Sequence, residues 1–117
     1  MYKIAIVDHE NDILQVLNRF FQREFEVVTF NNPQVALEHI LNNNYDIVLC
    51  DIMMPHMDGI ELLQKVRLQD NHTKFIMMTA FDTIDRALAA HRFGATNYIK
   101  KPFESLESVK EKILLEI

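Results

Sequence analysis

The chain has 117 residues, of which 49% are hydrophobic and 25% charged, with two glycines and three prolines. This composition is typical of one compact domain and excludes a disordered chain. The net charge of −5 argues against nucleic-acid binding, which requires a positive surface. Lys100, Lys101, Arg86 and Arg92 could form a local basic patch, but solvated helix and strand ends are the more ordinary interpretation.

We expect residues 1–117 to form a single domain, with no second domain in the chain. No apolar stretch approaches the roughly 18 residues of a membrane span. The N-terminal residues run directly into an apolar segment without a secretory leader. The sequence therefore predicts a cytoplasmic location and no membrane partner.

Short apolar segments alternate with amphipathic segments of ten or more residues, which is typical of βαβ units around a parallel sheet. Five such pairs fit, so we predict a single (βα)5 doubly wound α/β domain. The expected strands are Lys3–Asp8, Glu26–Phe30, Ile47–Asp51, Phe75–Thr79 and Asn97–Lys100. The expected helices run from Asn11 to about Arg23, from Pro33 to about Asn42, from Gly59 to Gln69, from Asp82 and Asp85 to Phe93, and from near Ser105 onward.

Two of these helices have apolar faces that we expect to be buried. In the fourth helix the expected face consists of Ile84, Ala87, Leu88 and His91. In the fifth helix it consists of Leu106, Val109, Ile113, Leu114 and Ile117.

Polar side chains occur at the ends of four expected strands. Asp8 and Asp51 end the first and third strands, Thr79 ends the fourth, and Lys101 follows the fifth. In an open parallel sheet, ligands bind outside the carboxyl ends of the strands. A buried carboxylate needs a cation, hydrogen bonds or water, or else takes up a proton. We therefore expect these four side chains to share one polar site.

This set of residues predicts a metal-assisted phosphate site. Two facing carboxylates repel unless a cation joins them, and Mg²⁺ favours carboxylates, waters and a phosphoryl oxygen. Asp51 would then attack a phosphoryl donor as a nucleophile and form an acyl phosphate. Lys101 would neutralise charge on the transferring oxygens, and the Thr79 hydroxyl would hydrogen-bond to a phosphoryl oxygen afterwards.

Several motifs occur together at these positions. They are Ile6-Val7-Asp8, Asp51-Ile52-Met53-Met54-Pro55 with Asp58-Gly59, Met78-Thr79-Ala80, Gly94-Ala95, and Tyr98-Ile99-Lys100-Lys101-Pro102-Phe103. With these motifs the chain resembles, over its full length, the receiver domain of response regulators in bacterial two-component signalling. The resemblance implies a flavodoxin-like sheet with the strand order 2-1-3-4-5.

The resemblance also implies roles for individual residues. Asp51 would be the phosphoacceptor, and Asp8, Asp51 and the backbone carbonyl of Met53 would hold Mg²⁺. Thr79 would be the switch hydroxyl, and Lys101 would stabilise the phosphoryl group. The implied function is a signalling switch rather than a metabolic enzyme, so the domain would catalyse only its own phosphorylation and dephosphorylation.

A further part of the resemblance concerns the switch and its partners. Tyr98 would be the aromatic residue that swings inward when the switch hydroxyl moves, and the Lys101–Pro102 bond would be cis. The implied phosphoryl source is a histidine kinase or a phosphotransfer protein. Effector binding or self-association would use the face formed by the fourth helix, the fifth strand and the fifth helix.

The chain departs from the family pattern after the first strand. Receivers usually carry two adjacent acids there, whereas this chain has Asp8-His9-Glu10. Three interpretations remain open: weaker Mg²⁺ binding by Asp8, Asp51 and the Met53 carbonyl, restoration of the charge by Glu10, or an altered choice of metal or none. His9 is either an inactive loop residue beside the pocket or a group that adds positive charge at mild acidity.

These residues are consistent with three functions. The first is a phosphorylation-controlled switch, and the second is a degenerate receiver that binds partners without phosphorylation because His9 replaces an acid. The third is a phosphohydrolase. Such enzymes usually carry an acid two residues after the nucleophile, whereas this chain has Met53 at that position. The chain is either a stand-alone receiver or part of a longer regulator.

Overall fold

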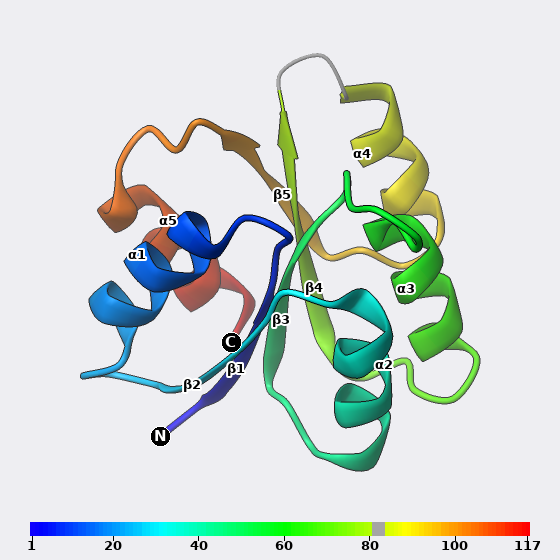
Figure 1. Cartoon of the computed structure of the whole chain (residues 1–117), viewed down its shortest axis with the longest axis horizontal. Coiled ribbons are helices and arrows are strands. Elements are labelled where there is room, and N and C mark those ends of the chain that lie inside the picture. Colours follow the sequence, from blue (N-terminus) through cyan, green and yellow to red (C-terminus); the bar gives the residue numbers. More distant parts are fainter. Residues whose placement is uncertain (81–83) are drawn as a thin grey trace.

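The computed structural model describes residues 1–80 and 84–117, without the side chain of Ile84. The described residues form five strands and five helices (Figure 1), and all strand pairs are parallel, in the order β2-β1-β3-β4-β5. This order confirms the predicted doubly wound fold. The elements are β1 Lys3–Val7, α1 Asn11–Phe21, β2 Glu26–Phe30, α2 Pro33–Asn42, β3 Ile47–Asp51, α3 Gly59–Arg67, β4 Lys74–Ala80, α4 Ile84–Arg92, β5 Asn97–Lys101 and α5 Leu106–Glu116.

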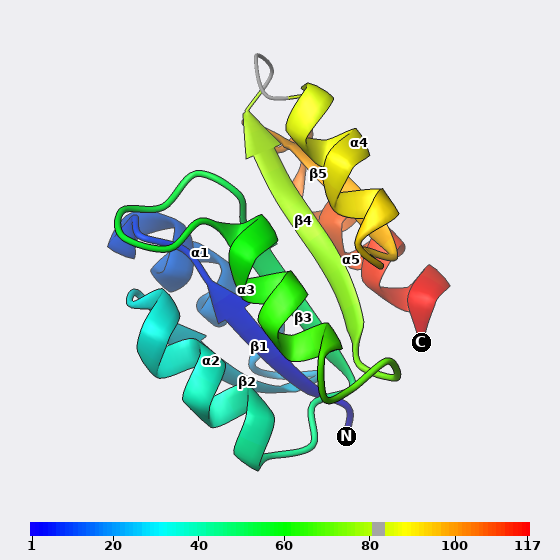
Figure 2. The same ribbon diagram turned by 90° about the vertical axis from the view of Figure 1, so that its right-hand side faces the viewer.

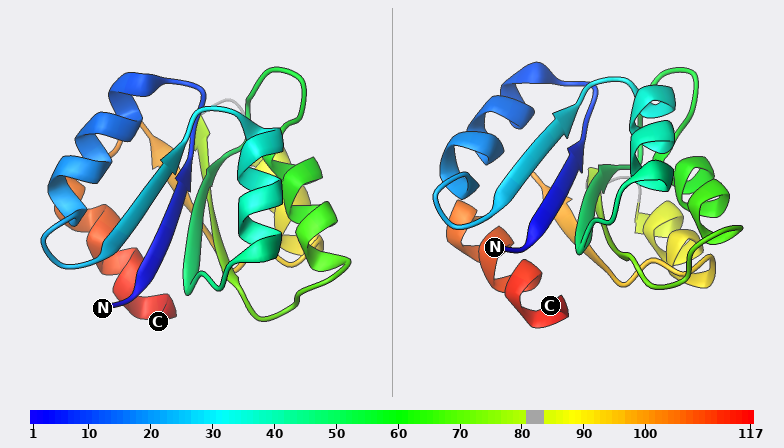
Figure 3. Two further views of the ribbon diagram at one scale, coloured as in Figure 1. Left: turned by 60° about the horizontal axis from the view of Figure 1, so that its bottom comes forward. Right: turned by 90° about the horizontal axis from the view of Figure 1, so that it is seen from below.

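The helices cover the two faces of the sheet unequally. Helices α1 and α5 lie on one face, and α2, α3 and α4 lie on the other, in front of the strands in Figure 2. Both termini lie at the same end of the sheet (Figure 3). Every residue of β3 is buried, as expected for a central strand between two helical layers. No described helix is both long and apolar enough to cross a membrane.

Local capping signals set the starts of three helices. The Asn32 side chain accepts hydrogen bonds from the backbone N–H groups of Gln34 and Val35, with proline in the first turn of α2. Asp58 caps α3 by accepting from the Glu61 N–H at 2.9 Å. Ser105 and its partner three residues later form a capping box at the start of α5.

The buried faces of the last two helices differ from the expected ones. In α4, Ala87 and Ala90 are buried, whereas His91 is exposed and Leu88 is 58% exposed. The prediction for this face was therefore wrong in part, because α4 packs against its neighbours through small alanines. Leu114 of α5 is also half exposed. Asp82 and the Ile84 side chain lie outside the described residues.

Gly59 allows the loop after β3 to fold back against the strand it leaves. Its N–H donates to the Ile52 carbonyl at 2.8 Å. A Cβ at this position would lie 2.2 Å from the backbone oxygen of Asp51, which is closer than van der Waals contact allows. Helix α3 therefore begins directly against the end of β3, and a residue larger than glycine would displace the backbone of Asp51.

We predict that Gly59→Ala destabilises the protein by about 1–3 kcal/mol, because the added methyl group overpacks the backbone. This sign is opposite to the ordinary gain of roughly 0.5–1 kcal/mol for Gly→Ala within a helix. Urea unfolding measures the change. Gln34→Ala, at an exposed first-turn position of α2, is the control and should change stability by no more than about 0.5 kcal/mol. Equal stability of Gly59→Ala and the wild type would contradict the close approach.

Candidate functional site

The register of the central strands brings the two predicted acids to one edge of the sheet. Val7 pairs with Cys50 in the parallel β1–β3 ladder. Asp8 is the first residue after β1 and Asp51 is the last residue of β3. Asp8 is completely buried and Asp51 is 3% exposed. The structure thus holds two carboxylates side by side at the rim of the core.

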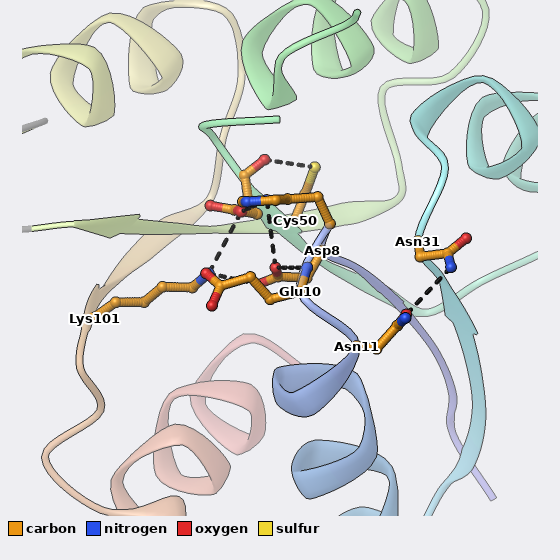
Figure 4. A network of polar contacts seen from close by, with 8 residues as sticks. Asp8, Glu10, Asn11, Asn31, Cys50 and Lys101 are labelled. Atoms are coloured by element: carbon orange, nitrogen blue, oxygen red, sulfur yellow. Dashed lines mark hydrogen bonds and ion pairs between the residues drawn. The ribbon is translucent and has the colours of Figure 1, made fainter. Parts of the chain in front are cut away.

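Lys101, the last residue of β5, joins these carboxylates with one ammonium group (Figure 4). Its Nζ atom donates to Asp8 Oδ2 at 2.5 Å and lies 3.4 Å from Asp51 Oδ2. The Lys101 side chain is 13% exposed. Glu10 lies at the outer side, with Oε1 3.9 Å from the same ammonium. Side chains at the ends of β1, β3 and β5 therefore meet in one charged cluster.

His9 faces the same cluster. Its Nδ1 atom lies 3.1 Å from Asp51 Oδ2 and 3.8 Å from Asp8 Oδ1. The imidazole is 40% exposed, so it lies between the buried acids and the solvent. The turn that carries it is held by hydrogen bonds from the Glu10 N–H to Asp8 Oδ1 and from the Asp8 N–H to the Phe30 carbonyl.

The charges of the cluster perturb Asp51. Burial raises the pKa of Asp51, and the neighbouring Asp8 carboxylate raises it further, whereas Lys101 and the His9 hydrogen bond oppose the rise. The carboxylates of Asp8 and Asp51 carry one more negative charge than the Lys101 ammonium neutralises. This excess negative charge attracts a cation. Burial also raises the pKa of the Cys50 thiol well above its usual range, since this residue of β3 is completely buried.

The donor set suits a divalent cation. Ligand atoms of Asp8, His9 and Glu10 all lie within 4.8 Å of one another, and the Asp51 carboxylate borders the same group. Carboxylate oxygens are the side-chain ligands that Mg²⁺ prefers. Met53 lies two residues after Asp51, between β3 and α3, and its side chain is half exposed.

The structure also describes the two predicted switch residues. Thr79 is completely buried and follows Met78, the register partner of Asp51, and its hydroxyl donates to the Ala80 carbonyl at 3.1 Å. Tyr98 is half buried in β5. Lys112 of α5 donates to the Tyr98 carbonyl at 2.9 Å, and its Nζ lies 5.2 Å from the centre of the Tyr98 ring.

One ion pair in the site region was not predicted. An ion pair joins Arg86 of α4 to Asp58 in the loop after β3, so Arg86 does not form a basic patch with Lys101, which lies among the acids. In the sequence, the Asp58-Gly59 pair predicts the start of a helix. No local pattern links Asp58 to Arg86, which lies 28 positions away. The Lys101–Pro102 peptide bond is cis, as the resemblance implied.

Comparison with known proteins identifies the family. Residues 4–113 match the family model described as the response regulator receiver domain. The chain belongs to this receiver-domain family. It is 39% identical to the regulatory protein AtoC of Escherichia coli over 103 residues, which cover 87% of this chain and 22% of AtoC. The chain spans less than half the length of the curated relatives that it matches first.

Solved structures agree with this membership. The response regulator TrrA of Thermotoga maritima, solved in complex with Mg²⁺–BeF, superimposes with a TM-score of 0.89 at 30% identity, and all of both chains is covered. The chemotaxis protein CheY4 of Vibrio cholerae gives a TM-score of 0.92 at 27% identity, with 100% of this receiver and 99% of that chain covered. The receiver is therefore a signalling domain of the two-component type.

The raised pKa of Asp51 makes a prediction about stability. The folded state binds more protons than the unfolded state between the ordinary aspartate pKa of about 3.9 and the raised pKa, so stability falls as the pH rises through this window. We expect Asp51→Asn to stabilise the receiver by about 1 kcal/mol at pH 7. The gain should shrink as the pH falls towards 4, as urea unfolding at several pH values would measure.

The control for this experiment is Glu38→Gln, which removes an exposed carboxylate from α2. Its stability relative to the wild type should show little dependence on pH. A stabilisation by Asp51→Asn that is absent at neutral pH, or that grows on acidification, would contradict the electrostatic description of the site.

Proposed function

We propose that this receiver is a phosphorylation-dependent switch that accepts a phosphoryl group on Asp51 from a histidine kinase or a phosphotransfer protein. The observation that carries the proposal is the Asp51 carboxylate, which is nearly buried beside Asp8 and lies 3.4 Å from the Lys101 ammonium. A carboxylate acts as a nucleophile on phosphorus in other covalent mechanisms. The fixed ammonium offsets the charge that such a transfer accumulates.

The proposed step transfers the group from a phosphohistidine. An Asp51 carboxylate oxygen forms a bond to phosphorus as the bond between phosphorus and the imidazole nitrogen breaks. The leaving nitrogen keeps the electron pair, and the imidazole leaves as the neutral base because its other nitrogen carries a proton. The product on this chain is an acyl phosphate, whose oxygens lie next to Lys101.

Asp8, Asp51 and the Met53 carbonyl would hold Mg²⁺, with Glu10 beside them. When bound, Mg²⁺ would neutralise charge on the phosphoryl oxygens. The Mg²⁺–BeF complex of TrrA, a relative at 30% identity, supports a cation in this pocket. His9 is 40% exposed and lies on the solvent side of these acids.

The proposed output is a change on the surface formed by α4, β5 and α5. Phosphorylation adds about −1.5 to −2 charge units beside Thr79, whose hydroxyl would leave the Ala80 carbonyl for a phosphoryl oxygen. Tyr98 would follow by leaving the Lys112 side chain. A shift of a few kcal/mol between the two states is enough to change the population that binds a partner.

Incubation with acetyl phosphate and Mg²⁺, followed by intact-mass measurement, tests the phosphoacceptor. We expect the wild type to gain the mass of one phosphoryl group and Asp51→Asn to gain none. Glu38→Gln is the matched control and should label like the wild type. A wild-type protein that gains no mass would contradict the proposal and favour a receiver that acts without phosphorylation, whereas repeated turnover of a phosphate ester would favour a phosphohydrolase.

The switch makes a separate prediction about Thr79. Thr79→Val removes the hydroxyl and keeps a side chain of similar size, so the variant should still be labelled on Asp51. Amide chemical-shift changes on phosphorylation should nevertheless be largely lost at Tyr98 and in α4. Thr79→Ser, which keeps a hydroxyl, should retain them. A full wild-type response in Thr79→Val would exclude the hydroxyl as the link between site and surface.

A further inference from the structure

His9 occupies a position in the metal pocket where an imidazole nitrogen can act as a ligand. Its Nδ1 atom is 3.1 Å from Asp51 Oδ2 and 3.8 Å from Asp8 Oδ1. In an octahedral site with bonds of roughly 2.1 Å, neighbouring ligand atoms lie about 3 Å apart. The His9 Nδ1 and Asp51 Oδ2 atoms thus have the spacing of adjacent ligands, whereas Asp8 Oδ1 lies somewhat farther from Nδ1. Without a metal, the 3.1 Å contact is a hydrogen bond, so a bound ion would take the place of its proton.

The ammonium of Lys101 does not occupy the side of the two acids that faces His9. It bonds to Asp8 Oδ2 at 2.5 Å, whereas the other oxygen, Asp8 Oδ1, lies on the His9 side and accepts a hydrogen bond from the Glu10 N–H. Asp51 Oδ2 lies between the imidazole and the ammonium. A metal ion on the His9 side would therefore not have to displace Lys101 from Asp8.

The turn that carries His9 holds the imidazole toward the acids. Hydrogen bonds fix the backbone on either side of His9. The Asp8 N–H donates to the Phe30 carbonyl, and the Glu10 N–H donates to Asp8 Oδ1. The ring is 40% exposed, so water can complete the coordination shell. The Glu10 carboxylate lies within the same cluster and adds negative charge.

The chemistry of this donor set differs from that of an all-oxygen pocket. Carboxylates, carbonyls and water suit Mg²⁺ and Mn²⁺, whereas imidazole suits zinc, nickel and copper. We propose that His9 coordinates the bound ion through Nδ1, and that it shifts the preference of the pocket from Mg²⁺ toward borderline metals such as Co²⁺ and Zn²⁺. The inference rests on the metal pocket of the proposed function and requires no phosphorylation.

Calorimetric titration of the unphosphorylated receiver with Mg²⁺, Co²⁺ and Zn²⁺ tests this preference. For the wild type, the dissociation constant for Mg²⁺ divided by that for Co²⁺ or Zn²⁺ should be large. In His9→Asp, which restores an oxygen ligand, this ratio should fall by about tenfold or more. The visible absorption of bound Co²⁺ should also change between the two proteins, because one nitrogen ligand is replaced by oxygen.

His72→Gln is the control, because it removes an exposed histidine far from the pocket in sequence and should leave both ratios unchanged. Equal ratios and equal Co²⁺ spectra in the wild type and His9→Asp would overturn the inference, as would a loss of Zn²⁺ binding in His72→Gln as large as in His9→Asp. The outcome is independent of the labelling experiment: failure of Asp51 labelling would contradict the switch but leave these titrations interpretable.

Discussion

The structure of this receiver depends on one electrostatic constraint: two carboxylates are buried at the ends of neighbouring strands and share a single ammonium. Burial of a charged pair without a partner is costly, so Asp8 and Asp51 require Lys101 in this position. The contact joins residues 93 positions apart and connects β5 to β1 across β3 and β4. The same contact leaves excess negative charge, and both the proposed cation and the proposed phosphoryl chemistry depend on that excess.

The rest of the fold holds this cluster in place. Parallel pairing of β1, β3 and β4 sets Asp8 beside Asp51 and puts Thr79 one residue past the partner of Asp51. Gly59 lets α3 start against the backbone of Asp51. The ion pair between Asp58 and Arg86 then connects the loop of the site to α4. This pair offers a physical link between the site and the surface proposed to change on phosphorylation.

Much of this arrangement could be predicted from the sequence, because it follows from local patterns and from the geometry of parallel sheets. Apolar runs that end in Asp8, Asp51 and Thr79 were enough to locate the edge where the site lies. The buried face of α4 was predicted incorrectly in part, because hydrophobicity alone favours Leu88, whereas close helix packing selects the small Ala90 beside the correctly predicted Ala87. Long-range pairs such as Asp58–Arg86, and the direction of the His9 ring, depend on tertiary structure and have no local signal.

Carboxyl-detected NMR titration of the metal-free protein shows whether Lys101 holds the two mutually repelling buried carboxylates together. Asp51 should titrate with a pKa above the ordinary aspartate value, because burial and Asp8 both raise it. Lys101→Met should raise the pKa of Asp51 further, since the ammonium opposes the rise. An ordinary pKa for Asp51 that Lys101→Met leaves unchanged would show that the cluster is not held together in this way.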